Sequence, residues 1–181
     1  MGEKLVFARR PKSEPEPESD ESWRILVVDD DPEVHAVTRL ALRSLRYSGR
    51  RAEILSAHSA AEARRVLAQG RPVAVILLDV VMETDDAGLQ LVRHIRDKMK
   101  NAAVRIILRT GQPGQAPEEH VIVEYDINDY KAKTELTAQK LFTSVITALR
   151  AFRDITMLEA HQQGLRQVIE CSDSLLKMRS L

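Results

Sequence analysis

The chain has 181 residues, which suits one domain with modest extensions. Its 27 basic and 27 acidic side chains cancel, so no global field favours nucleic acid or an anionic membrane surface. A single cysteine excludes an internal disulfide, and the chain contains neither a secretory signal pattern nor about 20 consecutive apolar residues. We therefore expect a cytoplasmic protein that binds neither nucleic acid directly nor a membrane, and whose partners recognise a local surface.

Three segments differ in composition. Residues 1–22 are rich in Pro, Glu and Ser and are expected to form a disordered arm, because they have few apolar side chains to bury. Residues 23–153 are expected to fold, and residues 154–181 to form a helical extension. This extension is typical of a dimerising coiled-coil linker to an absent output region, or of a helix packed on a domain. Its expected apolar seam comprises Ile155, Leu158, Leu165, Ile169 and Leu176.

Short apolar runs alternate with amphipathic segments between residues 23 and 153. Strands are expected within 23–30, 52–57, 73–79 and 104–110, with a weaker fifth strand near 126–132. Helices are expected over 31–47, 59–70, 89–100 and about 118–124, and from 135 or 136 onward. The first helix is expected to bury an apolar stripe of Val34, Val37, Leu40, Ala41 and Leu45. This order indicates the α/β class, with a doubly wound five-stranded parallel sheet and an extended C-terminal helix.

Polar side chains follow four of the five expected strands. They are Asp29 and Asp30 after the first, Asp79 after the third, Thr110 after the fourth, and Lys131 and Lys133 after the fifth. Because the carboxyl ends of parallel strands share one edge of a sheet, these groups are expected to converge. Carboxylates suit Mg²⁺, an aspartate can accept a phosphoryl group, and an ammonium and a hydroxyl can stabilise its oxygens. Helix capping explains each acid taken alone, but their joint placement favours phosphoryl chemistry.

The motifs VVDDD, ILLDVVM, ILRTG and DYKAK together resemble the receiver domains of bacterial two-component response regulators, over roughly residues 23–153. The resemblance implies a flavodoxin-like sheet with strand order 2-1-3-4-5 and phosphorylation of Asp79. It also implies that Asp30 and the main-chain carbonyl of Val81 bind Mg²⁺ directly and that Asp29 binds it largely through water. Thr110 and Lys133 would contact the phosphoryl oxygens. Tyr130 would be the switch aromatic, whose ring rotates on phosphorylation. The implied partners are a histidine kinase or phosphotransfer protein and a downstream output that reads the face of the fourth helix, fifth strand and fifth helix.

Two positions depart from the family pattern. Thr134 follows Lys133 where the family usually has a proline, often with a cis bond, and the loop after Asp79 is lengthened and acidic. Its acids Glu83, Asp85 and Asp86 are expected to cap the helix that starts near Ala87 rather than to bind metal. Val81 places an apolar side chain where an attacking water would approach, which predicts slow dephosphorylation.

The spellings VILLDVVMETDDAGL, RIILRTGQPGQAP and YDINDYKAKTELTAQKL resemble a receiver subgroup found at the front of larger regulators. Some of these carry a cyclic-di-GMP phosphodiesterase of the HD type. Three functions compete: a phosphorylation-driven switch, a hydrolase that uses Asp79 as its nucleophile, and a degenerate receiver. We expect the switch and not an enzyme, because the full set of site residues is present and no sizeable cap domain is available to enclose a substrate.

Overall fold

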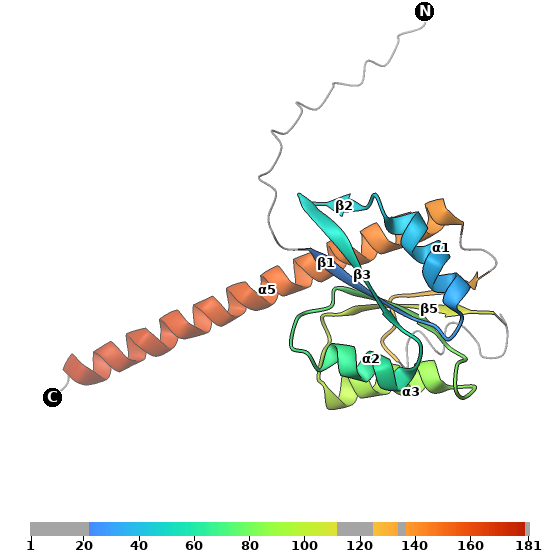
Figure 1. Cartoon of the computed structure of the whole chain (residues 1–181). Helices are drawn as coiled ribbons and strands as arrows, with labels where there is room; N and C mark the ends of the chain where they lie inside the picture. Colours follow the sequence, from blue (N-terminus) through green and yellow to red (C-terminus); the bar gives the residue numbers. More distant parts are fainter. Residues whose placement is uncertain (1–21, 112–124, 134–136, 180–181) are drawn as a thin grey trace, which may run out of the picture.

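The computed structural model describes residues 22–111, 125–133 and 137–179, and the side chains of these segments as far as residue 170. The expected arm before Ser22, the helix at 118–124, most of the loop after Gly111 and the peptide bond to Thr134 lie outside the described residues. The described part forms one sheet with helices on both faces (Figure 1).

The sheet contains six strands in the order β2-β3-β1-β4-β5-β6. Their bounds are β1 Trp23–Val28, β2 Arg46–Tyr47, β3 Arg50–Ala57, β4 Val75–Asp79, β5 Arg105–Thr110 and β6 Asp129–Ala132. Every pairing is parallel except that of the two-residue β2 with β3. Apart from β2, the strands have the expected order 2-1-3-4-5, so the α/β fold is confirmed.

The helices form two layers. They are α1 Pro32–Leu42, α2 Ala60–Leu67, α3 Ala87–Arg93 with the following π-helical turn η1 His94–Lys98, and α5 Ala138–Arg179. Figure 1 shows α2 and α3 on one face of the sheet and α1 with the first part of α5 on the other. Each interface is a separate apolar core, because successive residues of the buried strands point to opposite faces.

The first helix is shorter than the sequence indicates. We expected it to reach Tyr47, but α1 ends at Leu42 and a hairpin joins β2 to β3. Ser48 and Gly49 have φ angles of 48° and 71°, the pair of positive values required by a tight two-residue turn with right-handed strand twist. The indole of Trp23 donates a hydrogen bond to the Tyr47 carbonyl over 2.8 Å, which attaches the hairpin to β1.

The apolar stripe expected on α1 is buried only in part, at Leu45 just beyond the helix and at Ala41, which packs against the same core. Val37 and Leu40 are each 66% exposed, whereas the buried residues of α1 are His35, Thr38 and Leu42. The helix turns its polar side chains inward because they have partners there, which are described with the site below. Residue spacing alone could not show this, because it does not reveal which polar side chains have buried partners.

Helix α5 has two parts with different surroundings. Its first turns contribute Leu141, Val145, Leu149 and Phe152 to the core on the α1 side. Beyond residue 153 the helix projects from the domain (Figure 1), and Leu158, Leu165 and Ile169 of the expected seam are more than half exposed. None of the helices in the described segments is long and apolar enough to cross a membrane.

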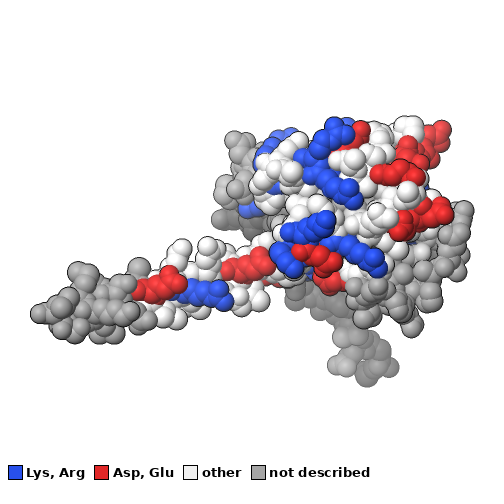
Figure 2. All heavy atoms as spheres, turned by 90° about the horizontal axis from the view of Figure 1, so that it is seen from below, with Lys and Arg blue, Asp and Glu red and all other residues white. Residues whose placement is uncertain are grey.

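Charged side chains of both signs share the face seen in Figure 2. Lys and Arg lie mainly in the middle of that face, and Asp and Glu lie at the end away from the projecting part of α5, beside the basic side chains and along the projecting helix. This arrangement agrees with the zero net charge of the sequence.

Candidate functional site

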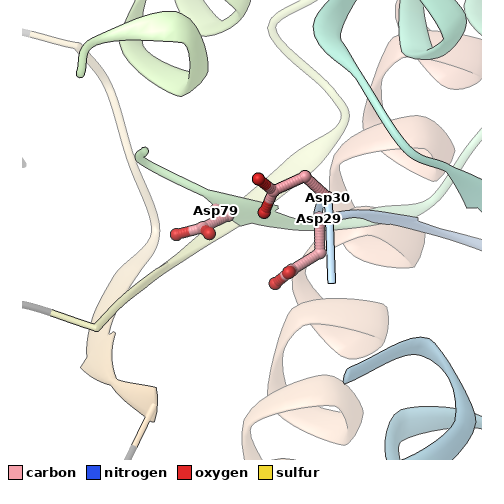
Figure 3. A group of neighbouring side chains, drawn as sticks. All are labelled: Asp29, Asp30 and Asp79. Carbon is pink, nitrogen blue, oxygen red and sulfur yellow. The ribbon is translucent and has the colours of Figure 1, made fainter. Parts of the chain in front are cut away.

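Three carboxylates meet at the carboxyl edge of the sheet. Asp29 and Asp30 follow β1, and Asp79 ends the adjacent strand β4, so parallel pairing of Val28 with Leu78 brings the side chains together (Figure 3). One oxygen atom from each lies within 4.8 Å of the others. Asp29 is fully buried and Asp79 only 4% exposed, whereas Asp30 is open to solvent. The structure thus brings these three expected site residues into one cluster.

Lys133 joins the buried acids. Its Nζ atom donates to Oδ2 of Asp79 over 2.7 Å, and it lies 3.0 Å from Oδ2 and 3.2 Å from Oδ1 of Asp29. Burial alone would lower the pKa of this ammonium, but its hydrogen bonds to the two carboxylates raise the pKa above the usual value. Lys133 is therefore charged at neutral pH. By contrast, Lys131 pairs with Asp129 at 3.1 Å, which supports the assignment of Lys133 rather than Lys131 to the site.

Asp79 is bonded on one side only. Oδ2 accepts from Lys133, while Oδ1 is buried and accepts no hydrogen bond from the described residues. Burial raises the pKa of the Asp79 carboxyl, and the nearby charge of Asp29 also raises it, against the lowering effect of Lys133. Asp29 differs because both of its oxygens are engaged, with Oδ1 also accepting from the Asp31 amide over 3.1 Å. Asp79 therefore carries the unsatisfied oxygen of the cluster.

The loop after Asp79 is held close to the strand by Gly88. The Gly88 amide donates to the Val80 carbonyl over 3.0 Å, and a Cβ atom at Gly88 would collide with the main-chain carbonyl of Asp79. Only glycine leaves room for this approach of helix α3 to the end of β4. Val81 is half-buried in the same loop, directly beyond the cluster. The glycine thus allows the close approach of α3 to the backbone at Asp79.

The acidic residues of the loop after Asp79 do not cap helix α3 as expected. Helix α3 does start at Ala87, but Glu83 accepts the Ala60 amide over 2.9 Å and so caps α2 instead. Asp86 occupies the N-cap position of α3, but its side chain makes no capping hydrogen bond. It accepts side-chain hydrogen bonds from Gln90 and Thr84, which lower the pKa of its carboxyl. The expected capping of α3 by Glu83 is therefore wrong, because the lengthened loop reaches the start of α2.

The two expected switch residues lie on strands next to the cluster. Thr110 ends β5 and is buried, with Ala132 as its neighbour in the register. Tyr130 lies in β6 opposite Leu108 and is 9% exposed within the core on the α2 and α3 side. The aromatic ring is thus already buried in this structure, and its rotation stays a prediction.

Sequence reasoning missed a second layer of polar residues behind the acids. Arg109 is 3% exposed; its guanidinium lies 3.5 Å from Oδ2 of Asp29 and donates to Thr38 Oγ1 over 3.0 Å. His35 Nε2 lies 2.7 Å from the main-chain carbonyl of Asp29. Strand pairing could have indicated that Arg109 lies near the cluster. Arg109 is the register partner of Asp79, so the two side chains share one face of the sheet.

The cluster has the donor set that Mg²⁺ requires. The ion prefers oxygen ligands and takes one or two carboxylates from the protein, keeping several waters. Asp79 Oδ1 is a buried oxygen without a partner among the described residues, and exposed Asp30 opens the cluster to solvent. These residues therefore fit a hydrated divalent cation.

Comparison with known proteins identifies the family. Residues 25–146 match the model of the response regulator receiver domain, so the chain belongs to that family. Residues 145–181 match a second model, described as a domain of unknown function (DUF3369). The chain is also 51% identical over 163 residues to 3′3′-cGAMP-specific phosphodiesterase 2 of Vibrio cholerae. This match covers 90% of the chain and 31% of the relative, so the chain spans about a third of that protein's length.

Solved structures share the fold. The signal receiver domain of an HD domain-containing protein from Pseudomonas fluorescens has a TM-score of 0.61 at 22% identity, covering 74% of this chain and 99% of that one. A structure of adenylate cyclase from Rhodopirellula baltica has a TM-score of 0.67 at 17% identity, covering 79% and 98%. At these identities the likeness shows the fold alone.

Proposed function

We propose that this receiver is a working phosphorylation switch in which Asp79 accepts a phosphoryl group with Mg²⁺ as cofactor. The observation that carries the proposal is the contrast between the two oxygens of Asp79: Oδ2 is held by Lys133, and Oδ1 is unsatisfied. A carboxylate fixed on one side and free on the other is oriented for attack. The donor would be a histidine kinase or a phosphotransfer protein.

In the transfer, one Asp79 oxygen forms a bond to phosphorus while the bond from phosphorus to the donor breaks, and the leaving group keeps its electron pair. Lys133 would then pair with the equatorial phosphoryl oxygens, and we assign the hydroxyl of Thr110 to the same oxygens. Positive charge aimed at these oxygens is the main source of catalysis in phosphoryl transfer.

Asp30 and Asp79 would hold Mg²⁺ directly, with the Val81 carbonyl as a further ligand and Asp29 acting largely through water. When bound, the ion neutralises charge on the phosphoryl oxygens. Burial raises the pKa of the Asp79 carboxyl, and the Lys133 ammonium opposes this shift. Lys133 therefore orients the Asp79 carboxylate and favours its ionised form.

Intact mass spectrometry after incubation with a small-molecule phosphodonor tests this proposal. We expect an adduct of one phosphoryl group that requires Mg²⁺ and is absent from Asp79→Asn. Sustained release of phosphate from many substrate molecules would instead indicate a hydrolase, and the absence of any adduct would indicate a degenerate receiver. Lys131→Met provides a matched control, because Lys131 pairs with Asp129 outside the cluster.

The output of the switch lies in the region that α5 enters. We propose the division into an arm of residues 1–22, a receiver of 23–153 and a helical extension of 154–181 that links to an output. A cyclic-dinucleotide phosphodiesterase is the proposed output, since the Vibrio relative has such a name and 51% identity.

The exposed apolar side chains of Leu158, Leu165 and Ile169 on α5 also suit a homodimer. Light scattering with and without the phosphodonor tests the dimer, which a constant monomer mass would contradict.

A further inference from the structure

Arg109 is a buried cation that the proposed mechanism does not use. Its side chain lies in the α1 face of the sheet, with 3% of the residue exposed. One end of the guanidinium faces Oδ2 of Asp29 at 3.5 Å, and Nη1 donates to Thr38 Oγ1 over 3.0 Å. Thr38 is 2% exposed and lies on α1, so both partners of the guanidinium are fixed.

The placement is energetically demanding. Removing an arginine from water costs several kcal/mol unless good pairing compensates, and Nε of Arg109 is buried with no partner among the described residues. Burial lowers the pKa of the guanidinium, although Asp29 and Asp79 oppose that shift. An arginine remains protonated in proteins, so its charge is permanent. Packing alone does not explain a permanent charge here, since the neighbouring strand positions Val27, Leu77 and Ile107 carry apolar side chains.

The charge of the pocket gives an explanation. The three carboxylates with Lys133 and Arg109 leave one net negative charge; without Arg109 two would remain. A phosphorylated Asp79 would carry close to two negative charges in place of one. Together with a divalent cation, that phosphorylated pocket would be near neutral only if Arg109 is counted. Arg109 therefore repels a metal cation and attracts the phosphoryl group.

We propose that Arg109 is a resident counter-ion of Asp29, positioned by Thr38, that weakens Mg²⁺ binding to the unmodified site and strengthens binding of the phosphoryl anion. This inference rests on the proposed function of the Asp79 site. It makes Arg109 a positioning and charge-setting residue, because the guanidinium contacts Asp29 rather than the reacting atoms. Its effects on a cation and on an anion must have opposite signs.

Calorimetric titration of Arg109→Met with Mg²⁺ tests the first effect. We expect at least about tenfold tighter binding than in the unaltered chain, because the substitution removes the repulsion between a buried unit charge and a divalent ion. Fluorine NMR titration with beryllium fluoride at saturating Mg²⁺ tests the second effect. Binding of this phosphoryl mimic should weaken several-fold.

Charge and shape are separated by matched variants. Arg109→Lys keeps the charge and should restore both affinities toward those of the unaltered chain. Thr38→Val removes the hydroxyl anchor but no charge and should change both affinities less than Arg109→Met does. Arg109→Gln provides a second neutral variant that keeps a donor for Thr38, should Arg109→Met unfold.

Opposite shifts of the two affinities in the neutral variants, restored by lysine, support the proposal. Unchanged affinities, or weakening of both ligands as expected from structural damage, would overturn it while leaving the switch function standing. If the unaltered chain bound neither Mg²⁺ nor the mimic, the proposed function itself would fail and the inference with it.

Discussion

The substitution Asp79→Asn should stabilise the metal-free protein. Oxygens of Asp79 and Asp29 lie within 4.8 Å; at an effective dielectric of 20, their repulsion costs about 3.5 kcal/mol. The variant loses a charge-assisted hydrogen bond from Lys133, which is worth about 1.5–3 kcal/mol. Burial and the charge of Asp29 raise the pKa of the Asp79 carboxyl despite this hydrogen bond, so we expect them to outweigh it. We expect a gain of about 1 kcal/mol, or roughly 2–4 °C in the melting temperature.

The gain should depend on pH in a defined direction. The folded-state pKa of Asp79 is raised above 3.8, so the folded chain binds more protons than the unfolded chain between those two values. The stability that Asp79 contributes is therefore highest below its unfolded pKa and falls as the pH rises through the folded pKa. The advantage of asparagine should develop over that interval and stay constant above it.

Urea unfolding of both chains in chelator, over a pH series, measures the difference. Added Mg²⁺ should reduce it, because the ion binds the folded native chain more tightly than the variant. An Asp79→Asn variant that is equally stable or less stable at neutral pH would refute the reasoning. It would mean that pairing with Lys133 outweighs burial and repulsion.

Three further changes have expected outcomes. Gly88→Ala should lower the free energy of unfolding by about 1–3 kcal/mol in thermal melts, because its methyl group meets backbone, whereas Gly164→Ala, with nothing within 4 Å, should cause no loss. Glu83→Ala should cost about 1 kcal/mol in urea unfolding by removing the bond to the Ala60 amide, and an unchanged midpoint would exclude this cap. Val81→Asn should shorten the phosphoryl lifetime by admitting an attacking water, and an unaltered lifetime in radiolabel decay would contradict the predicted slow dephosphorylation.

The alternation of buried strands with helices was enough to predict the main fold. The run from Val73 to Leu78 lacks any polar residue, which indicates a central parallel strand, and it became β4. The hairpin was missed because residues 43–47 continue a helical pattern, while the decisive signal is the positive φ at Ser48 and Gly49. Local turn conformation overrode periodicity there.

The acids at the strand ends could be placed from the sequence because parallel strands end at one edge. The second layer could not be placed in the same way. His35 and Thr38 face inward because they bond to the Asp29 carbonyl and to Arg109, and these contacts cross between distant segments. The cap of α2 by Glu83 likewise joins residues 23 positions apart, which no local pattern predicts.

The continuity of α5 limits how a signal can leave the receiver. The helix is held by the core through Phe152 and then continues without a break to Arg179, a free length of about 40 Å at 1.5 Å per residue. A tilt of α5 by a few degrees at Phe152 would displace its C-terminal end by several ångströms. A rotation of α5 about its own axis would turn its C-terminal end by the same angle. If α5 links the receiver to the proposed output, inserting or deleting residues beyond Phe152 should alter the response with the period of the helix.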